Sequence, residues 1–301
     1  MNMRRKVETV RWLLTKRPGW FRRLKLYLRF RRENNRWSRT CDWSTRVSEA
    51  VSSPDNAFIP RVANAGQVQD GRLIMHNGLM VHELGYYGEG LRDLVKANRG
   101  VHEPQEERLF MEVLKCLPPR SAMLEFGSYW AFYSMWFYRE IEQGVCYCVE
   151  PDSRNIRMGQ ENFAFNFGPN APRVFFENAF AGECEAAAGP ERQVPTVTTD
   201  GILSRHSVSR LALLHADTQG HELEVLVGAS KALASHAIDF VFLSTHSHEL
   251  HRLCLDTLTN FGYSIVADVD LLETYSFDGL IVGRSPRAPS CDVSSVSLKG
   301  Y

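Results

Sequence analysis

The sequence lacks several features that would assign it to a common class at once. Its 301 residues contain no apolar run long enough to cross a bilayer, and no apolar segment typical of a signal peptide follows the basic start. The seven cysteines are an odd number at irregular spacings, and none of them forms a C-x-x-C motif. We therefore expect a cytoplasmic protein with reduced thiols rather than a disulfide-rich secreted one.

The sequence also lacks a net charge, but its charges are unevenly distributed. Residues 1–40 contain 14 Lys and Arg against two Glu, with large apolar residues such as Trp12, Trp20 and Phe21 between them. This pattern is typical of a basic helix that lies on the surface of an anionic membrane. The alternatives are docking on the rest of the chain, whose net charge is −12, and, less favoured, binding to nucleic acid.

The composition divides the chain into four segments. Residues 1–40 are the basic, helical N-terminal extension, and residues 41–100 are a linker and N-terminal cap. Within that cap we expect residues 41–70 to be irregular and residues 74–82 to form a hairpin that turns at Asn77-Gly78. Residues 101–285 form the main domain, and residues 286–301 are predicted to be a loose tail.

Strands and helices alternate from Ser121 onward. The predicted strands are 121–126, 145–150, 173–177, 211–216, 238–245, 263–268 and 279–283, and the predicted helices are 130–141, 153–166, 199–205, 220–234 and 248–261. This order predicts an α/β protein with a Rossmann-like, doubly wound, mostly parallel seven-stranded sheet and helices on both faces. The last strand is expected to be antiparallel, because no helix closely precedes it.

Polar residues gather after two of the predicted strands. Asp217, Gln219, His221 and Glu222 follow strand 211–216, where open α/β sheets bind their ligands. Strand 238–245 runs into His246 and His248, which an extended chain would point in the same direction. Two imidazoles beside carboxylates suit general base catalysis or a metal site, whereas simple capping of the following helices is the alternative.

The first two predicted strands end in acids. Glu125 ends the first strand and is followed by Gly127, and Glu150 ends the second strand 25 residues later. An acid after the second strand is placed to hold the hydroxyl pair of a ribose. The chain has no G-x-G-x-x-G motif for cradling phosphates, so a ligand with a ribose and no phosphate fits best. This combination predicts S-adenosyl-L-methionine as the cofactor.

From about residue 101 to residue 283 the chain resembles the FkbM-type class I S-adenosylmethionine-dependent methyltransferases. The resemblance rests on Leu124-Glu125-Phe126-Gly127, Glu150-Pro151, Asn178-Ala179 and Thr198-Thr199-Asp200. Its most specific part is Asp217-Thr218-Gln219-Gly220-His221-Glu222, followed by Leu226-Val227-Gly228-Ala229. The chain departs from the family pattern in one loop, where Ser128-Tyr129-Trp130 replaces a small turn and Ala131 replaces the usual second glycine.

The resemblance implies an O-methyltransferase for a hydroxyl of a sugar in a glycan or glycolipid, or of a polyketide or other small molecule. The predicted catalytic residues are Asp217, His221, His246 and His248, and Asp217 and His246 would hold a divalent cation if the site uses one. The predicted cofactor-binding residues are Glu103, Glu125, Gly127, Ser128, Trp130, Glu150, Pro151, Asn178, Ala179 and Asp217. An inactive methyltransferase-like binding module of a membrane-associated glycan assembly complex is the alternative. Methylation of RNA is disfavoured, because the core is acidic and no N-P-P-Y-type motif follows the fourth strand.

Overall fold

The structure is a computed structural model that describes residues 43–84, 88–189 and 193–300. The basic extension predicted over residues 1–40 lies outside these described residues. No helix in the described part of the chain is both long and apolar enough to cross a membrane.

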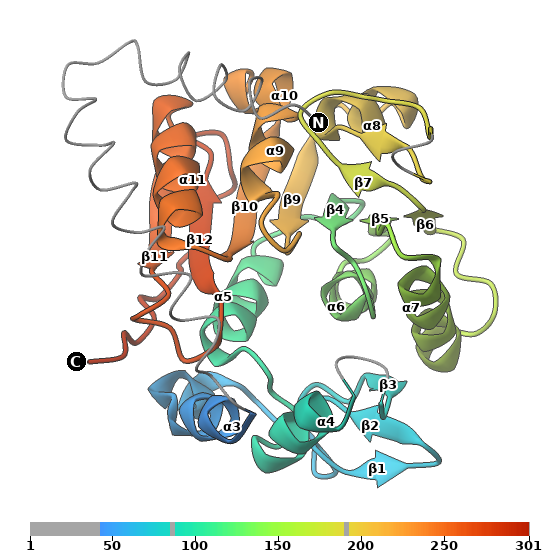
Figure 1. The fold of residues 1–301 in the computed structure, drawn as a ribbon, viewed down its shortest axis with the longest axis vertical. Coiled ribbons are helices and arrows are strands. Elements are labelled where there is room, and N and C mark those ends of the chain that lie inside the picture. The colour runs from blue at the N-terminus through green and yellow to red at the C-terminus, as the bar shows by residue number, and fades with distance from the viewer. Residues whose placement is uncertain (1–42, 85–87, 190–192, 301) are drawn as a thin grey trace.

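A seven-stranded sheet forms the centre of the molecule (Figure 1). Its strands are β4 (Ala122–Phe126), β5 (Val145–Val149), β6 (Val174–Glu177), β9 (Leu211–Ala216), β10 (Ile238–Thr245), β11 (Ser264–Val269) and β12 (Gly279–Arg284). They are arranged in the order β11-β12-β10-β9-β4-β5-β6. All neighbours pair in parallel except β12, which is antiparallel to both β10 and β11. The predicted fold class and the reversed last strand are both confirmed.

The alternation of side chains along the central strands divides the core between the two faces of the sheet. Met123 and Leu213 belong to one apolar cluster, and the next residues along each strand, Leu124 and Leu214, belong to the other. The first cluster includes residues of α5 (Pro104–Leu114), α6 (Phe132–Glu140) and α7 (Ser153–Phe167). The second includes residues of α8 (Thr199–Arg205), α9 (Glu222–Val227), α10 (Ser230–Ala234) and α11 (His248–Asn260). Helices therefore cover both faces, as predicted.

The helix predicted over residues 220–234 is divided into α9 and α10. A Cβ atom on Gly228 would lie 2.3 Å from the Gly182 carbonyl oxygen, so this position must stay a glycine packed against a neighbouring loop. The Asp200 carboxylate then accepts hydrogen bonds from the backbone N–H groups of Lys231 (2.9 Å) and Ala232 (3.0 Å). This capping starts a new helix and gives the Thr-x-Asp motif a structural role.

The N-terminal unit lies beside α5 and α6, below them in the view of Figure 1. It contains α3 (Trp43–Ser52), the 3₁₀ helix η1 (Pro54–Phe58), α4 (Gly88–Ala97) and a small sheet of β1 (Val68–Gln69), β2 (Arg72–Ile74) and β3 (Met80–His82). The expectation that residues 41–70 are irregular is wrong, because Ala50 and its neighbours in α3 bury an apolar face against α4. The predicted hairpin is confirmed by the pairing of Ile74 with Met80.

Two asparagines of α7 attach this unit to the main domain. The Asn166 side chain accepts a hydrogen bond from the Met80 N–H (2.9 Å) and donates one to the Met80 carbonyl (2.7 Å). The Asn162 side chain accepts a third hydrogen bond, from the His82 N–H (3.0 Å). These bonds satisfy backbone N–H and C=O groups at the edge of β3, and they hold the unit in place beneath the sheet.

The C-terminal tail after residue 285 contains neither helix nor strand through residue 300, but it is attached to the core rather than loose. A disulfide joins Cys291 to Cys116, which follows α5, so the prediction that all the thiols are reduced is wrong. The Ser294 N–H donates to Glu112 (2.7 Å), and the Ser297 N–H donates to Asp55 (3.0 Å). The spacing of the two cysteines, 175 residues apart, carries no sequence signal for this pairing.

Candidate active site at the strand ends

The first part of the site is a close contact between two strand ends. Gly127, directly after β4, has a φ of +73°, and a Cβ atom there would lie 1.8 Å from the Asp217 carbonyl oxygen. The Asp217 N–H in turn donates a 3.0 Å hydrogen bond to the Phe126 carbonyl. Only glycine permits this approach, because it has no Cβ and adopts positive φ at little cost. The loop after β4 therefore lies directly against Asp217 at the end of β9.

Glu222, the first residue of α9, organises the loop that follows β9. Its Oε1 accepts hydrogen bonds from the Thr218 N–H (2.9 Å), the Thr218 hydroxyl (2.9 Å) and the Gly220 N–H (3.2 Å). The side chain is fully buried, and its Oε2 has no hydrogen-bond partner among the described residues. The spacing from Asp217 to Glu222 therefore reflects a carboxylate that reaches back to hold the turn containing the first acid.

His246, directly after β10, lies among three carboxylates. Its Nδ1 is 3.1 Å from Glu222 Oε1, and its Nε2 is 3.2 Å from Asp217 Oδ1 and 3.3 Å from Asp278 Oδ1. His246, Asp217 and Asp278 are each 16–17% exposed, so the cluster is accessible from one side. We call His246 and the three acids Asp217, Glu222 and Asp278 the strand-end cluster. One ligand atom each of Asp217, Glu222 and His246 lie within 4.8 Å of one another, as the donors of a metal site would.

The charges of the strand-end cluster govern its protonation. Burial alone would lower the pKa of His246, but the charge of Asp278 and the contacts with Asp217 and Glu222 outweigh burial and raise that pKa to about 12. Burial raises the pKa of Asp278 to about 7, against the opposing charge of His246. The imidazole is therefore held as a cation that partly neutralises the three acids.

Two of the predicted catalytic histidines lie outside this cluster. His221 is 47% exposed, and its nearest acidic partner is Glu224, at 3.6 Å. His248 is the first residue of α11, and its Nδ1 lies 2.8 Å from Asp270. His246 and His248 contact different acids, because β10 ends at Thr245 and the Ser247 hydroxyl accepts from the Leu250 N–H and caps α11. The structure thus brings His246 together with Asp217 and separates the other two imidazoles from them.

The second acid of the predicted cofactor site ends β5. Glu150 is 5% exposed, and its carboxylate accepts hydrogen bonds from the N–H groups of Tyr129 (3.3 Å) and Asp152 (2.9 Å) and from the side chain of Asn155 (3.2 Å). Burial raises its pKa in spite of these bonds. Asn178, after β6, donates to the carbonyls of Glu150 and Pro151, both at 2.9 Å. The ends of β5 and β6 are therefore tied together around one carboxylate.

The loop after β4 has an unusual backbone. Tyr129 (φ +39°) and Ala131 (φ +59°) both adopt left-handed conformations, although neither is glycine. The Ser128 side chain is 1% exposed, and its hydroxyl has no hydrogen-bond partner among the residues described. Trp130 is 5% exposed and packs edge-on against His102, so its ring is directed toward the N-terminal unit. An unpaired buried hydroxyl beside Gly127 and Glu150 is a polar position that a bound cofactor would satisfy.

Two further acids of the predicted cofactor set are bonded within the fold. Glu125 accepts hydrogen bonds from the N–H and the hydroxyl of Ser134 in α6, and burial raises its pKa to about 7. Glu103 lies 3.0 Å from His102 Nε2 and accepts a 3.0 Å hydrogen bond from the Tyr133 hydroxyl. Ala179 is fully buried among the apolar residues below the sheet edge. These three residues remain predicted cofactor contacts.

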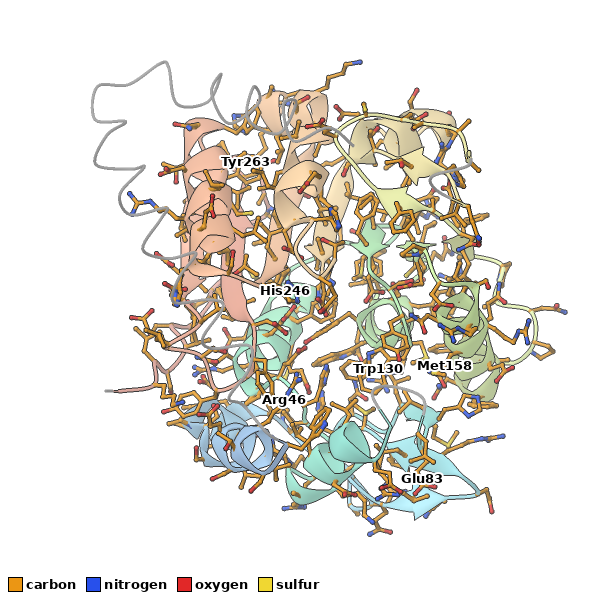
Figure 2. The ribbon with its side chains drawn as sticks, viewed as in Figure 1. Arg46, Glu83, Trp130, Met158, His246 and Tyr263 are labelled. Carbon is orange, nitrogen blue, oxygen red and sulfur yellow. A yellow bond between two sulfur atoms is a disulfide. The ribbon has the colours of Figure 1, made fainter. Side chains whose placement is uncertain are left out.

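Sequence reasoning missed two residues of this site. Asp278, directly before β12, was not predicted, since an Asp-Gly pair at the start of a strand is typical of an ordinary turn. Arg46, on α3, comes from a segment predicted to be irregular, yet it is 8% exposed and lies near the cluster (Figure 2). Neither residue has a local sequence signal, because both approach the site from distant parts of the chain.

The fold and the site together define a class I methyltransferase: a parallel sheet whose last strand is inserted antiparallel, with acids at the ends of its first two core strands and a polar loop after the fourth. Residues 122–265 match the model of the methyltransferase FkbM domain. The Glu150 carboxylate, the Ser128 hydroxyl without a partner among the described residues and the close approach at Gly127 fit the predicted cofactor, S-adenosyl-L-methionine.

Several solved structures are distantly similar to the chain. Ribosomal protein L11 methylase from Lactobacillus delbrueckii subsp. bulgaricus has a TM-score of 0.41 and 10% identity, with 62% of this chain and 81% of that chain covered. TrmK from M. capricolum, solved with S-adenosyl-homocysteine, has a TM-score of 0.40 and 12% identity, with 60% and 69% covered. Fibrillarin from Aeropyrum pernix, solved with S-adenosyl-L-methionine, has a TM-score of 0.38 and 17% identity, with 59% and 73% covered. No curated protein sequence matches the chain.

Proposed function

We propose that this protein is an O-methyltransferase that transfers the methyl group of S-adenosyl-L-methionine to a hydroxyl of a sugar in a glycan or glycolipid. The observation that supports this proposal is the strand-end cluster, which lies against the β4 loop through the contact between Gly127 and Asp217. A sugar hydroxyl is a weak acid, so its methylation requires a neighbouring group that removes or shares its proton. A site for nitrogen acceptors would have less need of this group.

The cofactor supplies a methyl group on a positively charged sulfur, which leaves when an oxygen atom attacks the methyl carbon. Glu150 would bind the ribose hydroxyls, with Pro151 shaping the turn beside it. Asn178 and Ala179 would lie along the edge of the adenine. The Ser128 hydroxyl would gain the hydrogen bond that it lacks among the described residues.

Asp217 is the proposed acceptor of the proton. Both ring nitrogens of His246 face carboxylates, although Nε2 forms no hydrogen bond with them, and the pKa raised to about 12 keeps the imidazole protonated. A protonated imidazole cannot accept the proton of the substrate. The Oδ1 of Asp217 interacts with His246 and with the Gln219 amide (3.1 Å), which leaves its second oxygen without a partner among the described residues. His246 would then orient the carboxylate and stabilise the charges of the site.

The same donors suit a divalent cation. Asp217, Glu222 and His246 would hold it, with the His246 proton displaced, and a cation at this place would acidify a hydroxyl bound to it. If the reaction uses a cation, methyl transfer should stop after treatment with EDTA and return with Mg²⁺ or Mn²⁺. Undiminished turnover in EDTA would leave the metal-free form of the proposal, in which Asp217 alone takes the proton.

Cofactor binding is tested first, by isothermal titration of the purified protein with S-adenosyl-L-methionine. Glu150→Ala should lose at least tenfold in affinity, since charged hydrogen bonds to a ligand contribute about 1.5–3 kcal/mol. Glu177→Ala is the matched control, because Glu177 ends the neighbouring strand β6 but pairs with Arg205 on the surface. The absence of binding to folded wild-type protein would refute the methyltransferase proposal and favour the inactive binding module.

Methyl transfer is tested with labelled cofactor and a panel of methyl glycosides of hexoses and deoxyhexoses. His246→Ala should bind the cofactor and lose turnover, whereas His221→Ala should keep most of it, because His221 is exposed and distant from the strand-end cluster. His248→Ala separates stability from catalysis, since it removes a contact with Asp270, which lies outside the strand-end cluster. Full turnover in His246→Ala would remove that residue from the mechanism.

The acceptor and the location of the protein are linked in this proposal. Residues 1–40 are proposed to hold the protein against the cytoplasmic face of the membrane, where a lipid-linked glycan would be within reach. The full chain should then co-sediment with vesicles containing phosphatidylserine and not with vesicles of phosphatidylcholine alone. Equal behaviour with both vesicles would remove the membrane from the proposal.

A further inference from the structure

Arg46 is a buried guanidinium without a hydrogen-bond partner among the residues that the structure describes. Its side chain is 8% exposed and stacks over the Phe277 ring at 4.4 Å and the Trp43 ring at 5.3 Å. Its Nε is buried and unpaired, and no hydrogen bond or salt bridge joins Arg46 to any described residue. Arginine carries five N–H donors, and leaving a charged donor buried and unpaired is costly. Ring stacking alone does not satisfy these donors, because it uses the face of the guanidinium and not its edge.

The position of Arg46 relates it to the strand-end cluster. Its charge acts on the carboxyl groups of Glu103 and Asp278, and in both cases it favours the ionised form. Neither acid forms a salt bridge with it, because Glu103 is paired with His102 and Tyr133, and Asp278 is paired with His246. In Figure 2, Arg46 lies between the N-terminal unit and His246. The guanidinium thus approaches the cluster from the opposite side to the sheet.

We propose that Arg46 forms an anion subsite between the N-terminal unit and the strand-end cluster, and that this subsite binds a carboxylate. This inference rests on the proposed function and deepens it. The planar guanidinium of Arg46, whose Cζ lies 4.4 Å from the centre of the Phe277 ring, carries pairs of parallel N–H groups that match the two oxygens of a carboxylate. The surrounding acids disfavour a dianion such as phosphate, because Glu103, Asp278 and Asp217 already supply negative charge. A ligand group with a single negative charge therefore suits the surroundings of Arg46 best.

A carboxylate can reach this subsite from two sources. One is the amino acid end of S-adenosyl-L-methionine, and the other is an acidic sugar acceptor such as a uronic acid. Two pairs of probes distinguish these sources. In each pair, one compound carries the carboxylate and the other lacks it. The first pair is S-adenosyl-L-methionine and its decarboxylated form. The second pair is methyl glucuronide and methyl glucoside, each titrated into protein saturated with S-adenosyl-homocysteine.

The test measures the affinity of the full chain and of three variants for these probes. Wild-type protein should bind the acidic member of one pair at least tenfold more tightly than its neutral counterpart. Arg46→Gln should lose this preference, and Arg46→Lys should restore only part of it, because lysine keeps the charge without the planar fork. Arg72→Gln is the matched control, since Arg72 also stacks on a ring, that of Phe165 at 4.0 Å, and has no contact with the cluster. Thermal unfolding of each variant checks that the fold is intact.

The outcomes separate this inference from the proposed function. A preference confined to the cofactor pair assigns the subsite to the methyl donor, and a preference confined to the sugar pair assigns it to the acceptor. Tight binding of S-adenosyl-L-methionine with no preference in either pair, or a preference that survives in Arg46→Gln, would overturn the subsite and leave the methyltransferase proposal standing. No cofactor binding to folded protein would refute both.

Discussion

Replacing Gly127 by alanine tests whether the β4 loop and the end of β9 depend on each other. The added Cβ would lie 1.8 Å from the Asp217 carbonyl oxygen and 2.8 Å from its carbonyl carbon, and both are backbone atoms that cannot rotate away. The two strand ends must then separate by about 1 Å, which is typical of an overpacked site and costs about 1–3 kcal/mol. Alanine at a φ of +73° adds roughly 1 kcal/mol.

Gly71→Ala provides the matched control for this prediction. Gly71 has a φ of +70°, close to that of Gly127, but a Cβ atom there would meet nothing within 4 Å. The control therefore carries the backbone cost alone, about 1 kcal/mol, whereas Gly127→Ala should lose about 2–4 kcal/mol in the free energy of unfolding. Equilibrium unfolding in urea at equal slopes measures both values.

The activity of the same two variants gives the functional half of the prediction. A displacement of about 1 Å between reacting groups can reduce turnover on the order of a hundredfold. Gly127→Ala should lose methyl transfer to that extent at a temperature where it remains folded, and Gly71→Ala should not. Equal losses of stability in the two variants, or normal turnover in Gly127→Ala, would refute the view that this contact aligns the cofactor loop with Asp217.

Two further predictions concern stability. Reduction of the Cys116–Cys291 disulfide, or its replacement in a Cys116→Ser/Cys291→Ser variant, should lower the free energy of unfolding by up to about 5 kcal/mol, because it releases a loop of 175 residues. Insensitivity of the wild-type midpoint to dithiothreitol would contradict this. The free energy of unfolding should also fall as pH rises from 6.5 toward 10. The ion pairs of His102 with Glu103 and Glu107 outweigh burial and raise its pKa to about 10, and Glu106 likewise raises that of His215 to about 9. Each histidine therefore stabilises the fold fully below its unfolded pKa of about 6.5 and loses that contribution through its folded pKa. Urea unfolding at pH 6.5 and 9.5 tests this, and a stability that is constant or rises with pH would exclude it.

The sequence predicted the main domain because its signals are local. Buried strands such as Leu211–Ala216 are continuous apolar runs, and their ends carry acids such as Asp217 whose position follows from the rules of parallel sheets. The contact of Asp217 with His246 follows from the same rules, since β9 and β10 are neighbours. The spacing of apolar residues and the strand order were therefore enough to place three of the four residues of the strand-end cluster.

The rest of the site depends on contacts between distant segments. Asp278 and Arg46 reach the strand-end cluster from the last strand and from α3, and the disulfide joins residues 175 positions apart. The local sequence is most misleading at the start of α5. Its charged residues are typical of an exposed helix start, yet Glu103, Glu106 and Glu107 are all buried. Only tertiary partners explain this burial, because isolated carboxylates in a core would be too costly.

Those partners show how α5 positions the site. One carboxylate, Glu106, lies 2.7 Å from His215 Nε2 and accepts a 3.0 Å hydrogen bond from the Ser244 hydroxyl. His215 precedes Asp217 by two residues on β9, and Ser244 precedes His246 by two residues on β10. Residues two apart on a strand share a face, so this carboxylate bridges the two strands one step before the acid and the imidazole emerge from them. The distance between Asp217 and His246 is thus fixed from below by a buried ionic bridge, which explains why a carboxylate is retained there despite its cost.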